Sequence, residues 1–167
     1  EGHSVQILAQ RAAIHTQTGK PQKAEKEIIN YINKHPEYKL DASLLLNRIY
    51  RQDNKNTESL HLLLQLNNEY PNEGLILTSL ADHYKNANND SLYEKYTIDA
   101  VKSATFDSES VIKIIRPILS GYVQNIDTSN IHTILNTLKQ IYPNESPIVE
   151  LQADVYKALK DTTNWRS

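Results

Sequence analysis

Histidines and carboxylates are the side chains most able to hold a metal or move a proton here, because the 167-residue chain contains six histidines and no cysteine. Glu58 and His61 stand three residues apart, the spacing of one half of a di-iron site on a helix. That chemistry needs a second such motif and more helix-borne carboxylates, and the sequence offers neither. We therefore expect no metal site. The histidines are spread along the chain, at His3, His15, His35, His61, His83 and His132.

Nucleophilic and phosphate-binding chemistry also lack a recognisable motif. The chain has no HExxH, GxGxxG or GxxxxGK[ST] pattern, and its four glycines are dispersed. No serine stands in a recognisable nucleophile setting, so we interpret His15 as a packing residue. His35, just before Pro36, is expected to cap the end of a helix. The sequence thus predicts a chain that is not an enzyme and binds no cofactor.

Two asparagines match the acceptor pattern for N-glycosylation, Asn89 followed by Ser91 and Asn144 followed by Ser146. Both triplets also fit a turn that leads into a helix, where a short polar side chain caps the first amides. We favour capping for both positions.

Charge and hydropathy exclude two classes of partner. The chain has 18 basic and 20 acidic residues, for a net charge of −2, so it has no excess positive field to attract a nucleic acid. No apolar run approaches the length of a membrane span, and the start EGHSVQ lacks the features of a signal peptide. Because the chain has no methionine, we expect a processed product or a segment of a longer protein.

Residues 19–36, GKPQKAEKEIINYINKHP, are interpreted as the loop and second helix of a helical hairpin that recurs along the chain. Gly19 permits a turn, Pro21 suits the first turn of a helix, and the apolar residues that follow share one helical stripe before Pro36 ends it. A helix-ending proline occurs again at Pro71 and Pro143, each within the sequence YPNE. Intervals of about 35 residues, or twice that, are typical of helix-pair repeats.

This pattern predicts an all-α fold of about nine helices. Asp41, Thr57, Asp127 and Ser146 are expected to cap helix starts. Pro117 lies inside an otherwise helical stretch, which predicts either a kink or a late helix start. The expected helices cover residues 4–18, 21–35, 41–52, 57–70 and 91–103. Further helices are expected between Asn72 and Asn86, over Val111–Val123, from Asp127 to Ile141 and from Ser146 onward.

Aligned on their turns, the pairs resemble the tetratricopeptide repeat, with His15 and Val123 departing from its aromatic position. The first pair matches at Leu8, Ala12, His15, Gly19, Ala24, Ile28 and Pro36, and the second at Leu46, Asn47, Tyr50, Asn54, Ser59, Leu63, Leu66 and Pro71. The third matches at Leu80, Ala81, Tyr84, Asn88 and Ala100, the fourth at Leu119, Ser120, Val123, Leu135, Leu138 and Pro143, and the last helix at Ala153 and Tyr156.

The resemblance implies a right-handed α-solenoid forming one domain over residues 1–167. Its repeats would cover about residues 4–37, 40–72, 74–106 and 108–144, with a partial repeat at 146–167. In the third repeat, Thr105, Phe106 and Asp107 take the place of the closing proline. An uncapped last helix would expose Leu151, Val155 or Leu159 and could drive self-association.

In this family the first helix of each pair lines a concave surface, which implies a non-catalytic scaffold for a protein or peptide partner. An alternative is a helical spacer or glycan-recognition module of a larger cell-envelope protein or enzyme. The order of the helix pairs and turns is also similar to that in multi-repeat cell-envelope proteins of Bacteroidetes-type bacteria. This similarity implies a location in the cell envelope or periplasm and leaves a cytoplasmic location open. The implied groove residues are Gln17, Arg48, Arg51, Gln52, Thr78, Asp82, Lys85, Asn86, Gln124, Glu150, Asp154 and Lys157.

Overall fold

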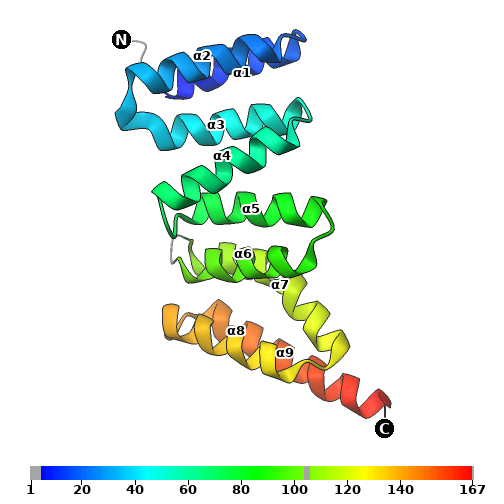
Figure 1. The fold of residues 1–167 in the computed structure, drawn as a ribbon. Helices are drawn as coiled ribbons and strands as arrows, with labels where there is room; N and C mark the ends of the chain where they lie inside the picture. The colour runs from blue at the N-terminus through cyan, green and yellow to red at the C-terminus, as the bar shows by residue number, and fades with distance from the viewer. Residues whose placement is uncertain (1–4, 104–105, 167) are drawn as a thin grey trace. The chain divides into compact units, whose positions relative to one another are not determined.

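A computed structural model describes residues 5–103 and 106–166, with side chains to residue 160. Within these residues the fold consists of nine α-helices and one short 3-10 turn, η1 (Pro36–Tyr38), with no strand (Figure 1). The predicted all-α class and helix number are confirmed. His3, Ser4, Thr105 and Ser167, which appear in the sequence predictions, lie outside the described residues. The helices are α1 (Val5–Gln17), α2 (Pro21–Lys34), α3 (Lys39–Gln52), α4 (Asn56–Glu69), α5 (Gly74–Asn86), α6 (Asp90–Lys102), α7 (Ser108–Asn125), α8 (Thr128–Ile141) and α9 (Ser146–Arg166).

The chain divides into two compact units, Glu1–Pro71 and Asn72–Ser167, which are described separately. In the first unit α1 packs on α2 and α3, α2 on α3, and α3 on α4, around a core that includes Ala12, Ala24 and Ile28. In the second unit each helix packs on the next, and α7 also packs on α9, and α6 on α8. Ile115, Leu135 and other aliphatic side chains fill that core. Whether both units form one domain stays a prediction.

The helix starts correct several predicted caps. Asp41 and Thr57 lie inside their helices, because η1 leads directly into α3 at Lys39 and α4 begins at Asn56. Ser146 is likewise the first residue of α9. Asp127 does cap α8, since its side chain accepts a hydrogen bond from the amide of Asn130.

The two asparagine triplets differ in their local structure. Asn89 caps α6, and its side chain accepts a hydrogen bond from the amide of Leu92 at 3.2 Å. Asn144 stands two residues before α9 with a φ of 66°, so it forms the turn instead of capping the helix. The capping interpretation is therefore confirmed for Asn89 and wrong for Asn144.

Pro117 does not delay the start of its helix. Helix α7 runs unbroken from Ser108 to Asn125 with Pro117 inside, so the late start is wrong. Proline has no amide hydrogen, and the carbonyl of Lys113, four residues earlier, therefore lacks its usual helical donor. A kink at this position stays a prediction.

The turn inside each helix pair repeats one backbone geometry. Gly19, Asn54, Asn88 and Ile126 all have a positive φ, between 54° and 71°. In each turn the next amide donates to a carbonyl five residues earlier, as in a Schellman motif. The distances are 2.8 Å from Lys20 to His15, 2.8 Å from Lys55 to Tyr50, 2.9 Å from Asn89 to Tyr84 and 2.9 Å from Asp127 to Tyr122.

This shared turn corrects the alignment of the fourth pair. The carbonyl that accepts the long turn bond belongs to His15, Tyr50 and Tyr84 in the first three pairs, which is the predicted aromatic position. In the fourth pair it belongs to Tyr122 and not to Val123. The fourth pair therefore has its aromatic residue, and the sequence alignment was one residue out of register.

The end of the chain differs from the prediction about exposed residues. Leu151, Val155 and Leu159 have exposed fractions of only 2%, 7% and 8%, because α9 turns them toward α7 and α8. Among the described side chains of α9, Val149 and Tyr156 are large, apolar and exposed.

Candidate functional site

The predicted groove residues of the first unit are exposed on two helices. Gln17 ends α1, and Arg48, Arg51 and Gln52 lie on α3. The predicted groove also takes in residues beyond Pro71, such as Asp82 and Lys85, which belong to the second unit. One continuous groove over both units therefore stays a prediction.

A first hollow in the second unit lies among α5, α6 and α7, and we call it the α5–α7 hollow. Its cavity volume is about 220 Å³. Three predicted residues lie along its α5 side, one turn apart, because a helix brings every third or fourth residue to one face. The lining residues are Thr78, Ala81, Asp82 and Lys85 of α5, Tyr93 and Thr97 of α6, and Lys113, Ile114 and Pro117 of α7.

The walls of this hollow combine apolar surface with charge. Ala81, Ile114 and Pro117 give it apolar carbon, while the Lys85 ammonium lies 5.3 Å from the centre of the Tyr93 ring. That distance is within the range of a cation–π contact. The rim thus carries two lysines and one aspartate around an apolar floor.

A second hollow, the α7–α9 hollow, lies between α7 and α9 and has a cavity volume of about 340 Å³. Its floor is aliphatic, and Arg116 and Asp154 at its rim approach to 3.9 Å from opposite helices. Gln124 and Asp154 are the predicted groove residues that it contains. The lining residues are Arg116, Leu119, Ser120, Val123 and Gln124 of α7 and Leu151, Asp154, Val155 and Ala158 of α9.

Exposed residues of α7 separate the two hollows. Lys113, Pro117, Ser120 and Gln124 are exposed and fall within one side of the helix at about 100° per residue. Of these four residues, only Gln124 was predicted as a groove residue. Pro117 was interpreted only through its effect on the backbone. The aromatic position was assigned to Val123 instead of Tyr122, and this shift by one residue misplaced the exposed face of α7.

Three predicted residues of the second unit lie outside both hollows. Asn86 is the exposed last residue of α5. Glu150 and Lys157 are exposed on α9, on a side that faces neither hollow. The predicted set therefore separates into Thr78, Asp82 and Lys85 at one hollow, Gln124 and Asp154 at the other, and the remainder elsewhere.

Tyrosines join neighbouring helices beneath this surface. The Tyr122 hydroxyl donates to Glu94 Oε2 at 2.6 Å, which ties α7 to the helix before it. Burial and this hydrogen bond raise the pKa of Tyr122 well above its ordinary value. Burial likewise raises the pKa of Tyr84, whose ring stacks on Tyr96 with 5.5 Å between centres. Both phenols therefore stay protonated at neutral pH and serve as donors or packing groups.

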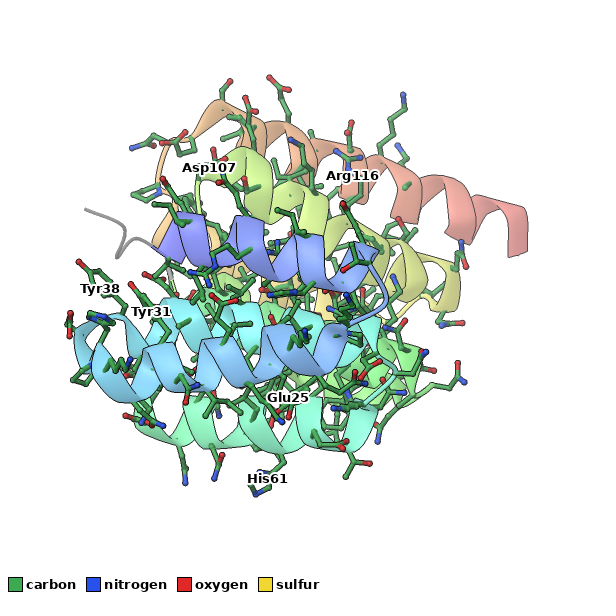
Figure 2. The ribbon with its side chains drawn as sticks, turned by 90° about the horizontal axis from the view of Figure 1, so that it is seen from above. Glu25, Tyr31, Tyr38, His61, Asp107 and Arg116 are labelled. Atoms are coloured by element: carbon green, nitrogen blue, oxygen red, sulfur yellow. The ribbon has the colours of Figure 1, made fainter. Side chains whose placement is uncertain are left out.

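His15 and His35 each contact a nearby glutamate. His15 Nε2 lies 3.4 Å from Glu27, and His35 ends α2 with its Nδ1 atom 3.3 Å from Glu37. The prediction that His35 caps a helix end is confirmed. His61 points away from the helices into solvent, while Tyr31 and Tyr38 lie side by side (Figure 2). The ring centre of His35 lies 4.7 Å from that of Tyr31. Within the described residues, no group of three or more histidine and carboxylate side chains is placed to hold a metal ion.

Comparison with known proteins yields no relative. The chain matches no protein family model, no curated protein and no solved structure. In the part of the chain that the structure describes, no helix is long and apolar enough to cross a membrane. Functional inference therefore rests on the geometry of the second unit.

Proposed function

We propose that the second unit binds a peptide or protein segment without catalysis, through the face formed by α5, α7 and α9. The observation that carries this proposal is the pair of hollows on either side of α7, each with an apolar floor and a charged rim. Peptide-binding surfaces commonly combine such anchoring pockets with polar groups that fix orientation.

The composition of the two hollows suggests the kind of ligand. The α5–α7 hollow suits a small apolar anchor flanked by an acidic residue, because Lys85 and Lys113 outnumber Asp82 at its rim. The larger α7–α9 hollow suits a branched aliphatic anchor, since its floor is formed by leucine and valine side chains. A peptide that fills both would cross the exposed side of α7.

The repeated turns support the resemblance to tetratricopeptide repeats as part of the same proposal. Contacts of α1 with α3, α7 with α9, and α6 with α8 bring together helices at corresponding places in neighbouring pairs. Such contacts are typical of stacked repeats. A solenoid arrangement of the whole chain, and a location in the cell envelope, are proposed on the sequence resemblance.

A selection from a library of random peptides, displayed on phage, tests the proposal without a known partner. Enriched peptides should carry apolar anchors with acidic neighbours. Their affinity for Ser120→Trp should fall at least about tenfold, or about 1.4 kcal/mol, because the indole fills space between the anchors.

Asn136→Trp on α8 is the matched control, since Asn136 is exposed on another helix and lines neither hollow. Affinity for this variant should equal that of the wild type. Failure of the library to enrich any peptide, or equal loss in both variants, would contradict binding at this face.

A further inference from the structure

The turn before α9 has the same structure as the turn before α5. Both have the sequence Tyr-Pro-Asn-Glu, and their asparagines, Asn72 and Asn144, share a φ of 66°. In both turns the glutamate carbonyl accepts hydrogen bonds from amides three and four residues later. The two helices can therefore be compared position by position. Val149 corresponds to Leu77, Ala153 to Ala81 and Tyr156 to Tyr84.

A hydrogen bond between neighbouring pairs supports this register. Tyr122 of α7 donates to Glu94 on the helix before it, and Tyr50 of α3 contacts Glu25 in the same way. The Tyr156 hydroxyl lies 3.2 Å from Nδ1 of His132, which occupies the corresponding place on α8.

The corresponding residues differ sharply in exposure. On α5, Leu77 and Ala81 are only 4% and 5% exposed, because α6 packs beside them as an antiparallel partner. On α9, Val149 is 57% exposed, Tyr156 is 45% exposed and Ala153 is exposed as well. We call Val149, Ala153 and Tyr156 the α9 stripe. It is a helix-packing surface that no helix in the described structure covers.

The edge of this stripe carries a specific charge pattern. Glu150 and Lys157 are exposed and seven residues apart, so they lie along the same edge, one near each end of the stripe. If two copies of α9 pack antiparallel about a twofold axis, Glu150 of each copy faces Lys157 of the other. Ala153 at the centre has a small side chain that lets two helices approach closely.

We propose that the α9 stripe is the interface of a homodimer, in which α9 packs antiparallel against α9 of a second copy. The stripe supplies an apolar seam, as its equivalent in α5 does for α6, and the Glu150–Lys157 pairs set the antiparallel orientation. Asp154 and Ala158, which line the α7–α9 hollow, lie on another side of the helix. The dimer and the peptide-binding face therefore use different surfaces.

Charge reversal tests this interface with the whole chain. Sedimentation velocity over a range of protein concentrations should show a monomer–dimer equilibrium for the wild type. Glu150→Lys and Lys157→Glu should each weaken the dimer at least about tenfold, because each places like charges together at both flanks. An equimolar mixture of the two variants should form a heterodimer of about wild-type affinity, since opposite charges then meet again.

Lys102→Glu on α6 is the matched control, because it changes charge at an exposed position on a helix that packs on α5, α7 and α8. It should dimerise as the wild type does, and circular dichroism should show every variant folded. A wild type that stays monomeric at all concentrations would overturn the proposal. So would a dimer that neither reversal weakens, since another surface would then hold the copies together. Ser120→Trp, which should weaken peptide binding, should leave the dimer affinity unchanged. Failure of the dimer proposal and failure of the peptide-binding proposal can therefore be distinguished.

Discussion

At the scale of single residues, the turn inside each helix pair depends on a left-handed backbone conformation. Gly19, Asn54 and Asn88 all adopt a positive φ. Glycine and asparagine tolerate this left-handed region better than other residues do. Ile126 holds the same conformation, although a β-branched residue ordinarily avoids a positive φ.

Substitutions at Asn54 test the importance of this conformation. Asn54→Ala should lower the free energy of unfolding by about 1 kcal/mol, because alanine disfavours the left-handed region, whereas Asn54→Gly should change it by less than about 0.5 kcal/mol. Urea denaturation measures both variants. Asn68→Ala, at an exposed position inside α4, provides the control and should be nearly neutral. Equal tolerance of alanine at the two positions would count against the turn geometry.

The Tyr122 hydroxyl makes stability depend on alkaline pH. Its pKa is raised in the folded state, so its contribution is complete below the unfolded pKa of about 10 and is lost as pH rises through the higher folded value. Tyr122→Phe removes this contribution. Urea midpoints measured at pH values from about 8 to about 11 should therefore fall less steeply for the variant than for the wild type. Parallel pH profiles would show that the pKa of Tyr122 is not raised in the folded protein.

At the scale of elements, helix existence could be predicted from sequence far better than helix contacts. Apolar spacing and turn residues placed nine helices correctly among the described residues, because both signals are local. Caps at Asp41 and Thr57 failed, since η1 and a short turn let each helix start earlier. The hollows could be predicted only in part, because Lys113 and Arg116 come together with α5 and α9 through packing that no local pattern encodes.

The contact between α3 and α4 offers a test of packing inside a helix pair. The buried Ser59 hydroxyl donates to Asn47 Oδ1 at 2.6 Å, at positions that are both alanine in the first pair, Ala12 and Ala24. Ser59→Ala should cost about 1 to 3 kcal/mol, because it leaves a buried acceptor unpaired. The double variant Asn47→Ala/Ser59→Ala should cost less than the sum of the single variants, since it restores an apolar contact. Additive losses in thermal denaturation would contradict this arrangement.

At the scale of the whole molecule, each unit has its own core. The buried cluster of the first unit extends from Leu8 to Ile49, and that of the second from Val101 to Leu159. We therefore expect a fragment of residues 72–167 to be helical and to unfold cooperatively by itself. Leu135→Ala should cost about 2 to 5 kcal/mol in the fragment and in the full chain alike. An unfolded fragment would show that the second unit depends on the first.

Peptide binding by the second unit is tested most directly by a titration of the isotope-labelled chain, followed by NMR, with the most enriched peptide from the library selection. Saturable chemical-shift changes should concentrate on α5, α7 and α9. They should include residues that line the two hollows, such as Asp82, Arg116 and Asp154. Shifts confined to the α9 stripe, to the outer face of α8 or to the first unit would contradict the assignment of this face as the binding surface.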